Sequence, residues 1–355
     1  MDNKSPVNPG KYIFIAILLI LGFFCFKLIQ PFLSYILLGL IFSVALNPIY
    51  SALSNKFKSK RAASIVTVLL VLLIIIIPTF FIVGSLVKQT TSFFGSINEE
   101  SFTSFNNYLV EHLGPKADLT ERLTGIVSTF QQFLLSSAFK IAGSVTDIVI
   151  GLFIMFSIMY YGFLQGEDRM QKISHIAPFS PERGYALINK IKNVTKAVIY
   201  GEVLIALAQG ILGGLGFLIV GIGNPIFWGF LIAVFAFLPL LGSGMITIPA
   251  GIILIATNNA LGGVFLLVYG LAVVGGIDYM LRPKIISGGS EIHPLTALIG
   301  VFGGLKLFGF TGIIIGPTIA ALFVALVSFY YEDYLKANTK KKVLSDNKKK
   351  RNKKS

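Results

Sequence analysis

The feature of this sequence that most restricts its fold is a long stretch without charge. Val203–Ile277, about 75 residues, contains no Asp, Glu, Lys, Arg or His. At about 20 apolar residues for each membrane-spanning helix, it has room for about three spans. Two other stretches also pass the roughly 18-residue threshold for a span, since Tyr12–Ile29 contains a single charged residue and Ala62–Val87 contains none. Only 13% of the residues are charged, about half of the ~25% typical of soluble domains. The sequence therefore predicts an all-α polytopic membrane protein.

The basic residues predict how the chain is oriented. The formal net charge is +14, and ten of the 30 lysines and arginines follow Tyr331. Other basic clusters lie at Lys56–Arg61 and within 165–199, on the same side as the tail if the spans alternate. By contrast, Gln89–Phe139 has five acidic and two basic residues. The excess of positive charge in cytoplasmic loops therefore predicts that both termini are cytoplasmic.

The same pattern divides the chain into segments. We expect Pro31 at a tight external turn between the first two spans, because proline fits the start of a helix. The polybasic tail is expected to touch anionic lipid, and nucleic acid is not an expected partner. The expected order is three scaffold spans in 1–88, an external amphipathic segment in 89–140, a fourth span in 141–165, a cytoplasmic amphipathic segment in 166–199, a transport core in 200–331 and a disordered tail in 332–355.

Two stretches of the expected transport core resemble each other. One runs from Pro225 through "FLPLLGSGMITIPAGIILI", and the other runs from Pro294 through "GGLKLFGFTGIIIGPTIAALF". Each opens at a proline, breaks at glycines and continues as Gly-x4-Pro, with Gly244–Pro249 in the first and Gly312–Pro317 in the second. The alternation of spans starts them on opposite sides of the membrane. We therefore expect about eight spans, with two broken or re-entrant hairpins in inverted orientation, an arrangement typical of secondary transporters.

Specific motifs add a family resemblance. The segments "YMLRPKIISGGSEIHPLTALIGVFGGLKLFGFTGIIIGPTIAALF" and "GILGGLGFLIVGIGNPIFWGFLIAVFAFLPLLGSG" resemble the autoinducer-2 exporter family of bacterial and archaeal membrane proteins. The resemblance is specific in 200–331 and rests on the order of the spans before residue 200. It implies a transporter of roughly eight spans in the plasma membrane of a prokaryote. Members of that family are linked either to export of autoinducer-2 or to sodium–proton antiport, so both substrates stay open here.

The broken helices supply the candidate binding residues. Unpaired backbone groups cost several kcal/mol each in lipid, so a persistent break is expected to line a site. Hydroxyls near the breaks could bind a small polyol or Na⁺. The candidate substrate-binding or ion-binding residues are Pro239, Gly242, Ser243, Gly244, Thr247, Asp278, Arg282, Gly309, Thr311 and Gly312.

Two carboxylates are candidates for coupling transport to an ion gradient. Asp278 lies close to the membrane core, where a carboxylate is costly and therefore a functional candidate. It also lies four residues before Arg282, so a structural ion pair within one helix is the alternative. Glu202 begins a span, where a helix N-terminus favours negative charge, and its coupling role is the weaker of the two.

The remaining motifs exclude most enzyme classes. The sequence has no metalloprotease, Walker A, Gly-x-Ser-x-Gly or dinucleotide-binding signature, and its three histidines are far apart. We expect no enzyme, cofactor or metal. The main hypothesis is a homo-oligomeric secondary transporter that works by alternating access and exports a small polar signal molecule of the autoinducer-2 type. The alternatives are a Na⁺(Li⁺)/H⁺ antiporter, a passive channel and a membrane scaffold that transports nothing.

Overall fold

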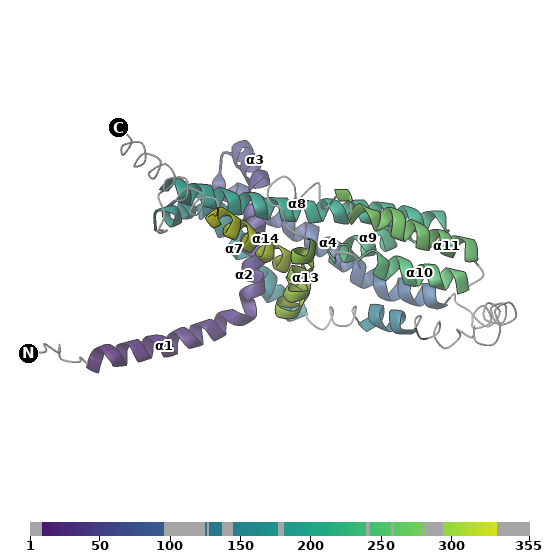
Figure 1. The fold of residues 1–355 in the computed structure, drawn as a ribbon, viewed down its shortest axis with the longest axis horizontal. Coiled ribbons are helices and arrows are strands. Elements are labelled where there is room, and N and C mark those ends of the chain that lie inside the picture. Colours follow the sequence, from purple (N-terminus) through teal and green to yellow (C-terminus); the bar gives the residue numbers. More distant parts are fainter. Residues whose placement is uncertain are drawn as a thin grey trace, which may run out of the picture.

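A computed structural model describes most of the chain. The described residues are 9–95, 125, 128–136, 145–176, 181–238, 242–256, 259–278, 280–281 and 294–331. Every regular element within them is a helix (Figure 1), which confirms the all-α prediction.

The helices differ widely in length. The elements are α1 (Pro9–Ile29), η1 (Gln30–Phe32), α2 (Leu33–Ala45), α3 (Asn47–Phe57), α4 (Lys60–Gly95), α7 (Val145–Ile176), α8 (Pro181–Ile219), α9 (Pro225–Phe235), α10 (Gly244–Ala256), α11 (Ala260–Tyr269), η3 (Gly270–Val274), α13 (Pro294–Phe308), η4 (Gly309–Thr311) and α14 (Gly312–Tyr330). Here η1 and η4 are 3₁₀ turns, and η3 is one turn of π-helix.

Six segments among the described residues are long and apolar enough to cross a membrane. They are Tyr12–Ala45, Lys60–Ile77, Thr146–Gly166, Glu182–Ile219, Ala260–Asp278 and Leu295–Tyr330. Two shorter apolar helices, Pro225–Phe235 and Gly244–Ile255, accompany them. The chain is therefore a multi-pass membrane protein, and the count of about eight spans stays a prediction.

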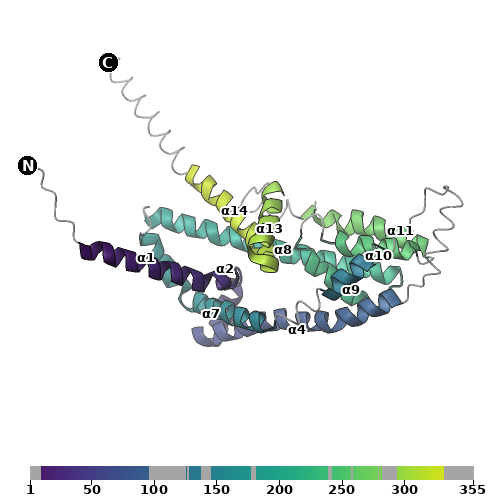
Figure 2. The same ribbon diagram turned by 90° about the horizontal axis from the view of Figure 1, so that it is seen from below.

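The first two helices do not form the expected hairpin. Ile29 and Leu33, which flank η1, both have right-handed helical dihedral angles, so the chain passes from α1 into α2 without reversing. Figures 1 and 2 show α1 leading away from the body of the molecule. The physical reason is that Pro31 occupies the first turn of the 3₁₀ helix, where its fixed φ angle and missing N–H disturb nothing.

One bundle is built around α2 and α7, which run parallel and touch through glycines. A Cβ atom added at Gly39 would lie 2.8 Å from the Met155 carbonyl oxygen, and one added at Gly162 would lie 2.7 Å from Ser43 Cβ. These glycines let the two backbones approach closely, as small residues commonly do between membrane helices. Side chains of α3, α4, α8 and α14 complete this core, which we call the first bundle.

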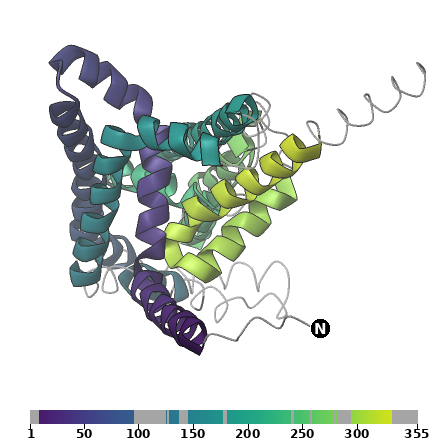
Figure 3. The same cartoon turned by 90° about the vertical axis from the view of Figure 1, so that its left-hand side faces the viewer.

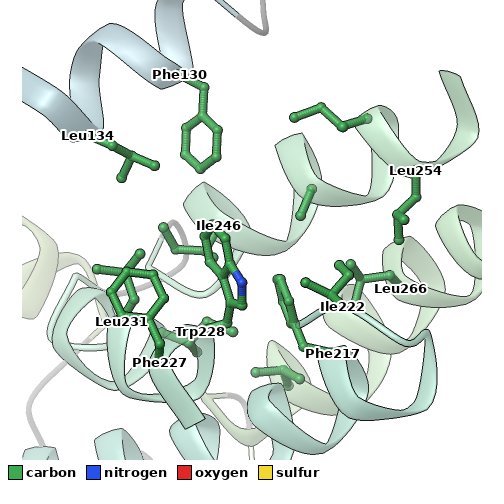
Figure 4. Packing of buried hydrophobic residues seen from close by; sticks show 14 residues of the cluster. Phe130, Leu134, Phe217, Ile222, Phe227, Trp228, Leu231, Ile246, Leu254 and Leu266 are labelled. Atoms are coloured by element: carbon green, nitrogen blue, oxygen red, sulfur yellow. The ribbon is translucent and has the colours of Figure 1, made fainter. Parts of the chain in front are cut away.

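A second bundle is built from the C-terminal part of α8 with α9, α10 and α11. The Trp228 ring is almost fully buried and stacks on Phe217 at 5.3 Å between ring centroids. Phe130 and Leu134, from the helix at residues 128–136, cover the same cluster (Figure 4). Within the amphipathic segment predicted in 89–140, residues 128–136 thus pack against neighbouring helices, whereas residues 89–95 continue α4.

The long helix α8 belongs to both bundles. Its 39 residues extend about 58 Å at 1.5 Å per residue. Val194 packs against α14, and Ile199 packs in the first bundle. Phe217, nearer the C-terminal end of α8, packs in the second bundle. Figure 2 shows α13 and α14 beside the middle of the molecule, and Figure 3, which looks along its long axis, shows these two yellow-green helices packed together at one side. This single helix therefore connects the two parts.

Both breaks expected from sequence are present as helix ends. The first hairpin comprises α9 and α10, which begin at Pro225 and Gly244; the second comprises α13 and α14, which begin at Pro294 and Gly312. With 11 and 13 residues, α9 and α10 are each shorter than the ~20 residues that a span requires.

Candidate functional site

The break between α9 and α10 is tightly wound. The Leu238 N–H donates to the Phe235 carbonyl oxygen at 2.8 Å, and the Gly242 N–H donates to the Leu238 carbonyl oxygen at 2.8 Å. A side chain at Gly242 would collide with the backbone at Phe235 and lie 2.8 Å from the Leu238 carbonyl oxygen. Glycine is therefore required at this position. Pro239, also a predicted site residue, lies outside the described residues.

Two buried hydroxyls lie at the N-terminal end of α10, on Ser243 just before the helix and on Thr247 within it. Ser243 is 6% exposed and Thr247 is 1% exposed. The Thr247 hydroxyl donates to the Ser243 carbonyl oxygen at 3.0 Å, so its oxygen keeps acceptor capacity. Gly244, between them, begins the helix and leaves this turn without a side chain.

A π-helical turn lies directly opposite these hydroxyls. A Cβ atom added at Gly270, the first residue of η3, would lie 2.7 Å from the Thr247 hydroxyl oxygen. The turn closes with the Gly275 N–H donating to the Gly270 carbonyl oxygen at 2.8 Å. Single π turns inside helices occur frequently at functional sites. The Thr247 hydroxyl thus faces an irregular backbone segment.

Gln209 brings an amide to the same region from α8. It shares one helix face with Leu212 and Gly216, and both of these residues contact Tyr269. The Tyr269 hydroxyl donates to the Leu212 carbonyl oxygen at 3.0 Å. A Cβ atom added at Gly216 would lie 2.8 Å from the Tyr269 ring. Because α8 and α11 run in opposite directions (Figure 1) and α8 packs along η3, Gln209 lies at the level of the π turn. Its side chain is fully buried, and neither amide atom has a hydrogen-bond partner among the described residues.

The two candidate coupling carboxylates flank this region. Asp278 is 7% exposed and follows the π turn, with its N–H donating to the Gly275 carbonyl oxygen at 3.1 Å. Glu202 is half-buried near the middle of α8, two helical turns before Gln209. The expectation that it lies at a helix N-terminus is therefore wrong, because α8 begins at Pro181 and continues through this position. Arg282 lies outside the described residues, so its pairing with Asp278 stays a prediction.

The second break has a different environment. Gly309 adopts a φ of 62°, an angle that glycine accepts readily. The Thr311 hydroxyl donates to the Phe308 carbonyl oxygen at 2.8 Å within its own turn. Gly312 is buried against Gly304 of the same hairpin. This turn packs on α2 in the first bundle, so these three candidates are not placed with Ser243, Thr247 and Asp278.

Two elements of the site were missed by sequence reasoning. Gln209 carries a usable signal, because it is the single polar residue in the apolar stretch 203–219, and polar groups inside membrane helices are commonly functional. The π turn carries a weaker signal, since the glycines at Gly270, Gly275 and Gly276 also suit plain helix packing.

Metal binding has no support in the described part of the chain. No group of three or more His, Cys, Asp or Glu side chains gathers there in a way that could hold a metal ion. The polar set at the π turn therefore consists of an amide, two hydroxyls and a carboxylate, which can bind a small solute through hydrogen bonds and accept a monovalent cation.

The sequence is similar to a known family of membrane proteins. The model of the "AI-2E family transporter" family matches residues 13–332. Three similar proteins are all named "Putative transport protein". One from Mycobacterium tuberculosis is 29% identical over 57% of this chain and 51% of its own length, one from Aquifex aeolicus is 26% identical over 82% and 88%, and one from Buchnera aphidicola is 30% identical over 93% and 95%. The chain thus spans about half the length of the mycobacterial relative and most of the other two. With an all-helical membrane architecture and a family match over nearly its whole length, the chain belongs to the AI-2E transporter family.

Proposed function

We propose that this membrane transporter moves a small polar solute past the π turn, between α8, α10 and η3. The observation that carries the proposal is the fully buried amide of Gln209, which has no hydrogen-bond partner among the described residues. Leaving a buried polar group unsatisfied costs about 1–3 kcal/mol. A solute that supplies the missing hydrogen bonds would gain that energy on binding.

The polar side chains of Gln209, Ser243 and Thr247 favour a neutral, hydroxyl-rich solute. An amide and two hydroxyls offer both donors and acceptors without a fixed charge, which suits a small signal molecule of the autoinducer-2 type. The family match supports this choice through its name alone. Export from the cytoplasm is the direction we propose, with both termini cytoplasmic in a prokaryotic plasma membrane.

Sodium–proton antiport is the second candidate, and Asp278 is the observation that favours it. The carboxylate is buried and follows the same π turn. A buried carboxylate can exchange a proton for Na⁺ or Li⁺, and carbonyl oxygens released by an irregular turn can complete the ion's coordination. In that case the hydroxyls of α10 would bind the ion rather than a polyol.

We further propose alternating access, in which the second bundle moves against the first. Support comes from the two separate cores joined through α8. Such movement against a fixed scaffold is easier when the scaffold is anchored in a homo-oligomer. A passive channel or a scaffold that transports nothing remains the contrasting hypothesis, because neither predicts coupling to an ion gradient.

Flux into proteoliposomes tests these proposals directly. Purified protein is reconstituted, and uptake of autoinducer-2, Na⁺, Li⁺ and H⁺ is compared with and without imposed sodium and proton gradients. Gradient-driven accumulation of one solute supports a secondary transporter. Flux that stops at equal concentrations indicates a channel, and a complete lack of flux would favour the scaffold.

Asp278→Asn separates the two transport candidates. If Asp278 binds the coupling proton or sodium ion, this variant loses gradient-driven transport by about tenfold or more, and the remaining flux no longer changes with pH. Asp147→Asn is the matched control, because Asp147 is an exposed carboxylate on α7, and it should transport normally. Unchanged pH dependence in Asp278→Asn would remove this residue from the coupling mechanism.

A further inference from the structure

A cavity lies in the first bundle, away from the π turn. It has a volume of about 470 Å³ and is lined by residues of α2, α7, α8 and α14, with Asn47 from the start of α3. Ligand pockets in proteins commonly measure about 300–1,000 Å³. None of the polar residues at the first break lines it, so it is a separate feature from the proposed transport site.

The cavity is cationic at one end. Lys192 and Lys196 line it from successive turns of α8, and the buried Thr195 lies between them. Among the described residues of its wall, none is acidic. Two positive charges thus face one cavity without an acidic residue in the wall to neutralise them, which suits an anionic ligand.

Most of the remaining wall is apolar, and the share of polar residues changes along the helices. Leu37 and Leu40 on α2 come first in the wall, and Asn47, the first residue of α3, comes after them. The Tyr200 hydroxyl donates to the Ala45 carbonyl oxygen at 2.7 Å. Because α8 runs opposite to α2 and α7, Lys196 and Lys192 lie beyond this bond, at the Asn47 end. One end is therefore polar and cationic, and the other end is formed by aliphatic side chains.

We propose that this cavity binds an anionic phospholipid, with its phosphate at Lys192 and Lys196 and part of an acyl chain along α2. The shape of the wall separates a lipid from a free anion, because a soluble phosphate would use only the cationic end and would leave the aliphatic end without a ligand. Other basic residues lie near the cationic end of the cavity, because the basic loop Lys56–Arg61 follows α3, which begins at the same end of α2. Basic pockets between membrane helices on the cytoplasmic side bind such head groups in other proteins.

The position of the cavity gives the lipid a consequence. Its wall contains residues of α2, α7, α8 and α14. Of these helices, α2 and α7 contact each other through glycines, and α14 belongs to the second hairpin. A bound lipid would fasten these four helices together at one end of the first bundle. It would stabilise the scaffold without touching the transported solute.

The test is lipid binding to the full-length protein in detergent, measured by thermal unfolding and by native mass spectrometry. The probes are phosphatidylglycerol, phosphatidylcholine and inorganic phosphate. We expect phosphatidylglycerol to raise the unfolding temperature, and the other two probes to have little effect at equal concentration. If inorganic phosphate protects equally well, or competes with the lipid at equal concentration, the site is one for a soluble anion and the lipid assignment is wrong.

Paired variants test the residues. Lys192→Gln with Lys196→Gln should weaken phosphatidylglycerol binding by about tenfold or more. The control, Lys56→Gln with Lys190→Gln, removes the same charge from residues outside the cavity wall and should bind within about twofold of the unaltered protein. Equal loss in both pairs would show a diffuse surface attraction and overturn the proposal.

A third variant keeps the test valid if the lysine pair folds poorly. Leu40 lines the cavity and is 49% exposed, so Leu40→Trp adds bulk there without opening a packed core. It should reduce phosphatidylglycerol binding while leaving the lysines in place. Normal lipid binding in this variant would contradict the assigned path of the acyl chain.

Discussion

The two broken hairpins share a sequence pattern but pack in different ways. Both begin at a proline, and in both the second helix begins at a glycine with a proline five residues later. In the second hairpin, α13 and α14 pack against each other along their length. In the first, α9 packs on α8 and α10 packs on α11, and α9 and α10 make little contact with each other.

The positions of the glycines explain this difference. In the second hairpin, Gly304 faces Gly312 and Gly316 across the same hairpin, and backbone meets backbone. In the first, a Cβ atom at Gly229 would lie 2.5 Å from the Gly210 carbonyl oxygen of α8. Likewise, a Cβ atom at Gly263 of α11 would lie 2.5 Å from the Gly251 carbonyl oxygen of α10. The first hairpin is therefore held open by its neighbours, and the second is closed on itself.

This difference is the reason for which we propose the solute site at the first break. At the first break Ser243 and Thr247 are buried, and the Thr247 hydroxyl lies against Gly270 of the π turn. At the second break the Thr311 hydroxyl bonds within its own turn, beside the exposed Phe310. A pattern of prolines and glycines thus predicts where helices break. Which surfaces then meet depends on the partner helices.

The largest effect is expected from closing the gap between α13 and α14. Gly304→Ala places a methyl group 2.8 Å from the Gly316 Cα atom and against the Gly312 carbonyl. Because backbone cannot move aside as a flexible side chain would, we expect a loss of about 1–3 kcal/mol or more in unfolding free energy. Thermal unfolding of the purified protein in detergent, followed by circular dichroism, measures the change.

The neighbouring glycine is the matched control. A Cβ atom at Gly303 would have no heavy atom within 4 Å. Gly303→Ala should leave stability unchanged or raise it by about 0.4–1 kcal/mol, since alanine restricts the unfolded chain. Equal destabilisation by both variants would mean that α13 and α14 are not held together through Gly304.

Much of this architecture could be predicted from sequence, and the reason is physical. The uncharged stretch Val203–Ile277 requires membrane helices, and Pro225, Gly244, Pro294 and Gly312 are the residues at which the structure begins its broken helices. Proline and glycine change the backbone conformation at the positions where they stand, so the helix breaks that they cause can be predicted from the sequence. Pro31 shows their limit, because the same preference for a helix start permitted the chain to continue rather than reverse.

The composition of the site could be predicted only in part. Ser243, Thr247 and Asp278 stand out as polar residues near breaks, and the structure places the Thr247 hydroxyl against Gly270. Gln209 lies on another helix, and its relation to them depends on the register between α8 and α11. Register is set by packing between segments more than 50 residues apart, which no local pattern encodes.

The second largest effect is expected from Gln209→Leu, and it should act on stability and transport in opposite directions. Leucine has a similar size and needs no hydrogen bonds, so removing the unsatisfied amide should stabilise the fold by about 1–3 kcal/mol. Transport should nevertheless fall by about tenfold or more, because the solute loses its partner. Unfolding temperature and proteoliposome flux are measured on the same preparation.

The exposed amide of Gln30 in η1 provides the control for this variant. Gln30→Leu changes the same chemical group far from the π turn, and neither stability nor transport should change much. If Gln209→Leu transports normally, the proposed site at the π turn is wrong even if the protein becomes more stable.

The smallest effect is expected from a pair of threonine variants that compares the two breaks directly. Thr247→Val and Thr311→Val each remove a hydroxyl that donates to a carbonyl oxygen three or four residues earlier. Each should therefore cost a similar ~1 kcal/mol of stability. Transport should fall several-fold in Thr247→Val alone, because only that hydroxyl lies beside Gln209 and the π turn. Equal losses of transport would show that both breaks bind the solute, which would require them to approach each other during the transport cycle.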